Sequence, residues 1–169
     1  MKNITKFFSI ALVVLGFSTS SFAQVGVTAT ATAAGTIVAP IAIAKNVDMN
    51  FGNVAVNATA GTVVLANDGS RSQTGGVTLP AVTGTVTAAQ FTVTGTSGYA
   101  YTFTVPAIAT TVSNGTDNMT ITNFTSNSLG LLTGGTEIVK VGATLNVGAS
   151  ISAGLYTSAT PFIVTVNYN

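Results

Sequence analysis

The sequence contains no histidine, cysteine or tryptophan, and it contains very little charge. Only five bases and four acids occur among its 169 residues. Without histidine there is no Ser–His or Cys–His pair to activate a nucleophile. Without cysteine there is neither a disulfide nor a thiolate ligand for a metal. We therefore expect a protein that is not an enzyme, has no metal or catalytic site and needs no cofactor.

Residues 1–23 have the pattern of a secretory signal peptide. Two lysines precede an apolar run over residues 7–17, which is too short to span a bilayer. Ser21-Phe22-Ala23 then fits the small-x-small rule for cleavage before Gln24. We expect an exported protein of the periplasm, cell surface or extracellular space in a Gram-negative type of bacterium. The mature chain should have no membrane span.

The mature chain, residues 24–169, carries three bases and four acids, a formal charge of −1. Nucleic-acid binding depends on clustered lysine and arginine, so it is excluded as a function class. A chain of this length buries enough surface to fold on one core without disulfides. No linker interrupts it, and we expect residues 24–169 to form a single domain.

Apolar and polar residues alternate along most of the mature chain, which is typical of half-buried strands. No long stretch has the 3.6-residue period of a helix. These features predict an antiparallel immunoglobulin-like or fimbrial-like β-sandwich of about nine or ten strands. The alternation places six apolar residues in its core: Phe91, Val93, Tyr101, Phe103, Leu145 and Val164.

Glycine-containing segments punctuate the strands. Residues 67–70 (Asn-Asp-Gly-Ser) and 113–116 (Ser-Asn-Gly-Thr) have the composition of tight turns. Gly75-Gly76 and Gly134-Gly135 indicate loops.

Six segments, taken in order, resemble the bacterial domain-of-unknown-function family numbered 4402. They are TATATAAGTIVAPIAIAK, DMNFGNVAV, GTVVLANDGSRSQTGGVTL, FTVTGTSGYAYTFTVP, LLTGGTEIVKVGATLNV and the terminal FIVTVNYN. The resemblance covers nearly all of the mature chain. It implies an exported β-sandwich, and it brings no catalytic residues because the family has no established chemistry.

The two ends of the mature chain give a looser resemblance to fimbrial subunits and to spore-coat-U-like proteins. Both ends alternate as strands do, although the disulfide common in fimbrial subunits is missing. This resemblance implies strand exchange with another copy, or with an assembly chaperone. The candidate pairing residues are Val25, Val27, Ala29, Ala31, Phe162, Val164, Val166 and Tyr168.

A few other residues are candidates for binding. Residues 67–71 are compatible with a calcium loop, but one carboxylate is few for calcium, and a hairpin turn is the simpler interpretation. Asp117 lies in a similar polar loop. Tyr99 and Tyr101 are candidates for stacking against a sugar, although their shared parity with Phe103 favours core packing.

Three functions from different classes remain open at this point. The first is a structural or adhesive surface subunit, which would bind copies of itself or a cell surface. The second is a soluble module that binds a glycan. The third is a glycosidase, which would need two of the four acids, Asp48, Asp68, Asp117 and Glu137, to flank one bond.

Overall fold

The computed structural model describes residues 26–169. The chain divides into two units, Met1–Thr36 and Ile37–Asn169. In the first unit, residues 26–36 have no regular secondary structure and are exposed. The predicted signal peptide, residues 1–23, and the candidate pairing residue Val25 lie outside the described residues.

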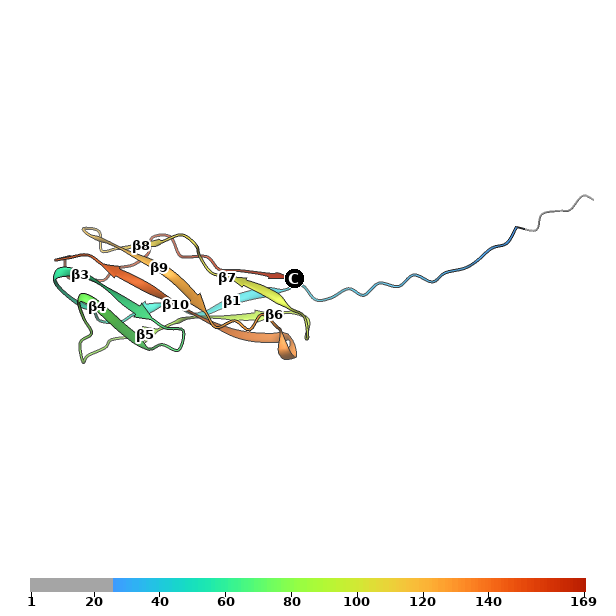
Figure 1. Cartoon of the computed structure of the whole chain (residues 1–169), viewed down its shortest axis with the longest axis horizontal. Helices are drawn as coiled ribbons and strands as arrows, with labels where there is room; N and C mark the ends of the chain where they lie inside the picture. Colours follow the sequence, from blue (N-terminus) through green and yellow to red (C-terminus); the bar gives the residue numbers. More distant parts are fainter. Residues whose placement is uncertain (1–25) are drawn as a thin grey trace, which may run out of the picture. The chain divides into compact units, whose positions relative to one another are not determined.

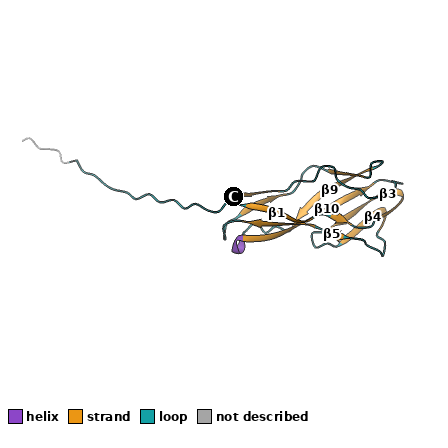
Figure 2. Cartoon of the chain, turned by 180° about the vertical axis from the view of Figure 1, so that it is seen from behind, coloured by secondary structure: helices purple, strands orange, loops and turns teal. Residues whose placement is uncertain are grey.

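The second unit consists of strands joined by turns and loops, with one helical turn among its described residues; Figure 2 draws this turn in purple. That turn is a 3₁₀ helix, Thr133–Gly135. The eleven strands are β1 (Ala42–Val47), β2 (Asn50–Phe51), β3 (Ala55–Leu65), β4 (Arg71–Thr78), β5 (Val86–Thr87), β6 (Ala89–Thr94), β7 (Tyr101–Thr104), β8 (Thr110–Ser113), β9 (Asn118–Ser126), β10 (Thr136–Val147) and β11 (Thr165–Tyr168). Among the described residues, no helix has the length and hydropathy needed to cross a bilayer.

The long strand β10 organises the main sheet (Figure 1). Its first half, Thr136–Val141, pairs with β6, and its second half, Ala143–Val147, pairs with β3. β9 also pairs with β10, over Val141–Asn146. β1, β4 and β8 complete this sheet by pairing with β6, β3 and β9. Every pairing is antiparallel. Because β10 pairs with three other strands, it is the central strand of this sheet.

A smaller ladder formed by β7 and β11 packs against the main sheet. The ring of Phe91 on β6 lies 6.2 Å from that of Phe103 on β7 and 6.4 Å from that of Phe162, just before β11. A second pair of short strands, β2 and β5, supplies Phe51 to the same core. The antiparallel β-sandwich predicted from alternation is therefore confirmed, with eleven strands instead of nine or ten.

The core residues follow the alternation closely. Four of the six predicted core residues are buried: Phe91, Val93, Tyr101 and Leu145. Phe103 and Val164 are half-buried but pack against the core. Along β10, buried apolar side chains alternate with the half-buried Lys140, Thr144 and Asn146 as predicted. This confirms that one face of each long strand supplies the core.

Two local predictions were wrong. The alternating segment at the mature N-terminus forms no strand: residues 26–40 have no regular secondary structure. Gly75-Gly76 lies inside β4 instead of a loop, and Gly75 faces Gly61 of β3. A Cβ atom on Gly76 would lie 2.0 Å from the Thr59 carbonyl oxygen, so these glycines permit close approach of two strands.

Gly142 has a comparable role at the centre of the domain, and we predict that Gly142→Ala destabilises it. Gly142 is buried in β10, and a Cβ atom there would lie 2.3 Å from the Leu65 carbonyl oxygen of β3. Forcing the strands apart should lower the free energy of unfolding by about 1–3 kcal/mol. Urea denaturation measures this, with Gly35→Ala as the control because nothing lies within 4 Å of a Cβ atom at Gly35. Equal stability of the two variants would contradict the prediction.

Candidate binding surfaces

Each of the four acids of the mature chain accepts hydrogen bonds from its surroundings. Asp48 accepts one from Lys45 at 2.6 Å on the exposed surface. Asp117 accepts one from the backbone N–H of Ser152 at 2.7 Å, and this contact holds the pKa of Asp117 below its ordinary value. Among the described residues, no group of three or more acidic, histidine or cysteine side chains could hold a metal ion. The acids therefore tie loops and turns together.

Residues 67–71 form the turn between β3 and β4. The Asp68 carboxylate accepts hydrogen bonds from the Ser70 hydroxyl at 2.7 Å and the Ser70 N–H at 2.8 Å. These bonds lower the pKa of Asp68, and the charge of Lys140 adds a smaller effect in the same direction. Gly69 has a φ of 91°, which favours glycine at this position. Of the two interpretations of this segment, the hairpin turn is confirmed.

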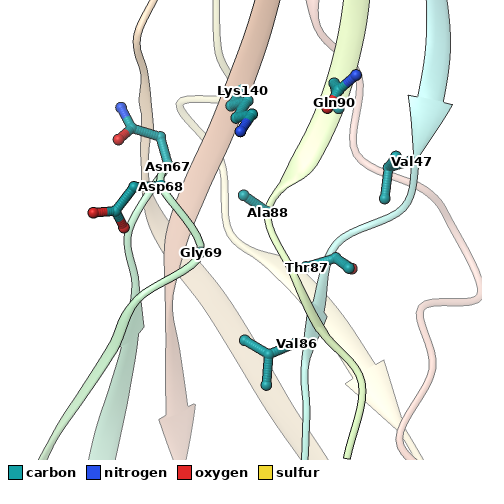
Figure 3. A pocket seen from close by; sticks show the side chains of 9 residues that line it. All are labelled: Val47, Asn67, Asp68, Gly69, Val86, Thr87, Ala88, Gln90 and Lys140. Atoms are coloured by element: carbon teal, nitrogen blue, oxygen red, sulfur yellow. The ribbon is translucent and has the colours of Figure 1, made fainter.

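A small hollow opens beside this turn (Figure 3). It is bounded by residues 67–69, by residues 86–88 and by Val47, Gln90 and Lys140, and it measures about 210 Å³. Sites for small molecules typically measure about 300–1,000 Å³. Lys140 supplies its only cationic group and Asp68 its only anionic one. The hollow is therefore smaller than an ordinary ligand site and has few groups to orient a ligand.

The two candidate sugar-stacking tyrosines have different environments. Tyr101 is only 2% exposed and belongs to the core, as its parity predicted. Tyr99 is 43% exposed, so the prediction of core packing was wrong for it. Its ring lies 5.7 Å from that of Tyr168, whose hydroxyl accepts a hydrogen bond from Thr96 N–H and donates one to the Ala39 carbonyl. Tyr99 lies just before β7, where the backbone turns at Gly98, which has a φ of 81°.

A second, larger hollow lies where one antiparallel ladder opens. Residues 101–104 pair with residues 165–168, and further along the same two segments Ser113 pairs with Thr157. Between these paired ends, no backbone–backbone hydrogen bond joins residues 105–112 to 158–164 in the described chain. A groove of about 780 Å³ occupies the gap. We call it the ladder groove, and it is lined by Pro106, Ala107, Ile108, Ala109, Thr110, Thr111, Ser113, Asn118, Thr157, Ala159, Thr160, Pro161, Phe162 and Ile163.

Two prolines explain why the ladder opens. Pro106 lies on one wall of the ladder groove and Pro161 on the other. Proline has no N–H to donate to a strand partner, so each interrupts pairing on its own segment. The chain also bends at Ala107 and Ile108, which separates β7 from β8. Ile108 and Ile163 are left 82% and 73% exposed.

The candidate pairing residues fall into two groups. Val27, Ala29 and Ala31 are exposed and outside any strand. Val166 and Tyr168 lie on β11 and pair with β7 of the same chain, whereas the half-buried Phe162 and Val164 precede β11. Phe162 also lines the ladder groove. The C-terminal candidates thus lie in and beside this groove.

Comparison with protein families gives one result for this domain. Residues 41–168 match the model of a family described as Domain of unknown function (DUF4402). The chain belongs to this family. The matched range of this DUF4402 domain begins just before β1 and ends with β11, so it includes both walls of the ladder groove. Residues 26–40, which form no strand, lie outside the match.

Searches among curated proteins and among solved structures gave no match for the chain. The fimbrial and spore-coat-U resemblance, and the immunoglobulin-like topology, therefore stay predictions. The ladder groove of the DUF4402 domain was not predicted from the sequence either. The available signal was the pair of prolines in strand-like runs, which indicates interrupted pairing but not which segments face each other.

Proposed function

We propose that this protein is a non-enzymatic structural or adhesive subunit of the bacterial surface, exported and assembled by strand pairing. The ladder groove is the observation that supports this most strongly. None of the residues that line it is charged. Proteins that remain monomeric usually protect such edges with lysine, another charge or a covering loop. An exposed edge without charge favours pairing with another chain.

Unpaired backbone groups line this edge. On β8, Ser113 exchanges backbone hydrogen bonds with Thr157 at 2.9 and 3.0 Å. Backbone groups alternate in direction along a strand, so the N–H and C=O of Thr111 point to the same edge as those of Ser113. Thr110 and Val112 direct theirs to β9 on the other side. Thr111 therefore offers a donor and an acceptor to a further strand.

The side chains of the domain also fit a non-enzymatic role. Histidine and cysteine are absent from the sequence, and the acids accept structural hydrogen bonds from neighbouring groups. General acid–base catalysis needs a group whose proton is exchanged with a substrate. The carboxylates of Asp68 and Asp117 have lowered pKa values, so neither is suited to act as a general acid near neutral pH.

Self-association of the mature protein tests the proposal. Residues 24–169 should form oligomers or filaments as concentration rises, seen by sedimentation velocity and electron microscopy, and sheared surface fractions of the native cell should contain the protein. Thr111→Lys should weaken association by about tenfold, because a charge on the edge disfavours pairing. Thr94→Lys is the matched control, since Thr94 is also exposed but pairs on β6 with β1 and β10. A mature protein that stays monomeric at high concentration and is absent from the surface fraction would rule out the proposal.

A second function, glycan binding, is favoured by the exposed ring of Tyr99 beside Tyr168. Aromatic faces stack against sugar rings, and Tyr99 is the more exposed of the pair. A glycan array probed with the monomeric protein tests this function. Binding that disappears in Tyr99→Ala, but persists in Leu131→Ala at a similarly exposed position, would favour the glycan module over the assembly subunit.

A further inference from the structure

We propose that the ladder groove accepts residues 27–34 of a second copy of this chain as an additional β-strand. This inference rests on the proposed assembly and specifies the contact that makes it. The groove is bordered by two segments that are held together at both ends and separated between them. A strand inserted there would restore the missing ladder on both sides. The inference therefore names both the acceptor surface and the segment that fills it.

The acceptor surface would fit a short strand without charged side chains. Between the paired ends, one wall extends over residues 105–112 and the other over residues 158–164. Thr111 presents unpaired backbone groups, and a strand of the inserted chain would satisfy them. Ile108 and Ile163 would lose much of their exposed apolar surface, which is favourable.

Residues 27–34 meet these requirements. They are as many as residues 105–112, so as a strand they would span the same length. They contain no charge, and valine and alanine alternate with threonine through Val27, Ala29 and Ala31. They form no strand in the described structure and are exposed.

The alternation also fixes which face of the inserted strand is buried. The apolar positions, represented by Ala29 and Ala31, should face the core side of the groove near Phe162. Thr28 and Thr30 should face solvent. A period of two makes the two sets of substitutions a direct test of register.

Disulfide trapping tests the contact. Because the chain has no native cysteine, only the introduced thiols can form a disulfide. Two full-length mature proteins, one with Thr28→Cys and one with Ile163→Cys and a size tag, are mixed and oxidised mildly, because Thr28 and the exposed Ile163 would lie on the same, solvent face. Because the thiols are on different molecules, only contact between copies produces a heterodimer. Val82→Cys replaces Ile163→Cys in the control, since Val82 is 76% exposed but lies outside the groove. All three positions are exposed, so the variants should fold.

Strand insertion predicts at least about a tenfold excess of the groove heterodimer over the control, because docking raises the effective concentration of the two thiols. In parallel, Ala29→Asp with Ala31→Asp should abolish self-association, whereas Thr28→Asp with Thr30→Asp should preserve it.

Self-association with equal trapping at Ile163 and Val82 would overturn the inference but leave the proposed assembly intact. A wild-type protein that stays monomeric, or equal effects of the two aspartate pairs, would overturn the inference as well. A wild-type protein that stays monomeric would also rule out the proposed function.

Discussion

Phe91→Ala should lower the free energy of unfolding by about 3–5 kcal/mol, the usual cost of removing a buried aromatic ring. Phe91 is 8% exposed and lies on β6 between its partners β1 and β10. Its ring contacts those of Phe103 and Phe162 from the facing layer. Truncation therefore leaves a cavity at the point where the two layers meet, and the surrounding strands cannot close it without breaking their ladders. Urea denaturation of the mature protein measures the loss.

Thr94→Ala provides the control on the same strand. Thr94 lies on the exposed face of β6, so its truncation should change stability by less than about 0.5 kcal/mol. Phe103→Ala should cost less than Phe91→Ala, because Phe103 is half-buried. A loss in Phe91→Ala no larger than that in Thr94→Ala would mean that Phe91 does not form the contact between layers.

Alternation was sufficient to predict the fold class because a strand with one buried face has a period of two. The strand β10 shows this most clearly, since Val139, Val141, Ala143 and Leu145 are all buried as their spacing requires. The pattern says nothing about partners, however. That β10 pairs with β6 along one half and with β3 along the other depends on contacts between distant residues.

The same reasoning failed where a strand lacked a partner. The segment over residues 26–36 alternates as regularly as the core strands, yet it is not a strand in the structure. Alternation shows that a segment can lie on a sheet, but pairing also requires unpaired backbone groups beside it. The error for Gly75 and Gly76 was the reverse, since they were predicted in a loop and lie in a strand. Glycine usually indicates a loop, but it also occurs in a strand where another backbone comes close.

The candidate surface was only partly predictable for a related reason. Phe162 was a candidate pairing residue and does line the ladder groove, whereas Val166 and Tyr168 pair within the chain. The groove depends on two segments that are distant in sequence and diverge between fixed ends. Pro106 and Pro161 mark the divergence, but their mutual position follows only from the register of β7 with β11.

One partly buried hydrogen-bond network gives the domain a sensitivity to alkaline pH. The Tyr101 hydroxyl donates a hydrogen bond to Glu137 at 2.6 Å and lies 3.0 Å from the Ser128 hydroxyl. The other oxygen of Glu137 accepts a hydrogen bond from Leu129 N–H at 2.7 Å. Burial raises the pKa of Tyr101 to about 12, and the hydrogen bond to Glu137 acts in the same direction. The folded structure therefore favours the neutral form of Tyr101 over the ionised form.

We predict that the protein loses about 2–3 kcal/mol of stability between pH 10 and pH 12 through Tyr101. The unfolded chain releases this proton near its ordinary pKa of 10, before the folded protein does, so the stability is fully present below pH 10 and falls as pH rises through the folded value. Urea denaturation at pH 8, 10, 11 and 12 measures the decline. Tyr101→Phe cannot ionise at this position and should be less stable at pH 8, because Glu137 loses a donor, but its stability should decline less with pH. The other tyrosines are common to both proteins, so the difference between the two profiles isolates Tyr101. Parallel profiles for the two proteins would show that Tyr101 ionises as readily in the folded domain as in the unfolded chain.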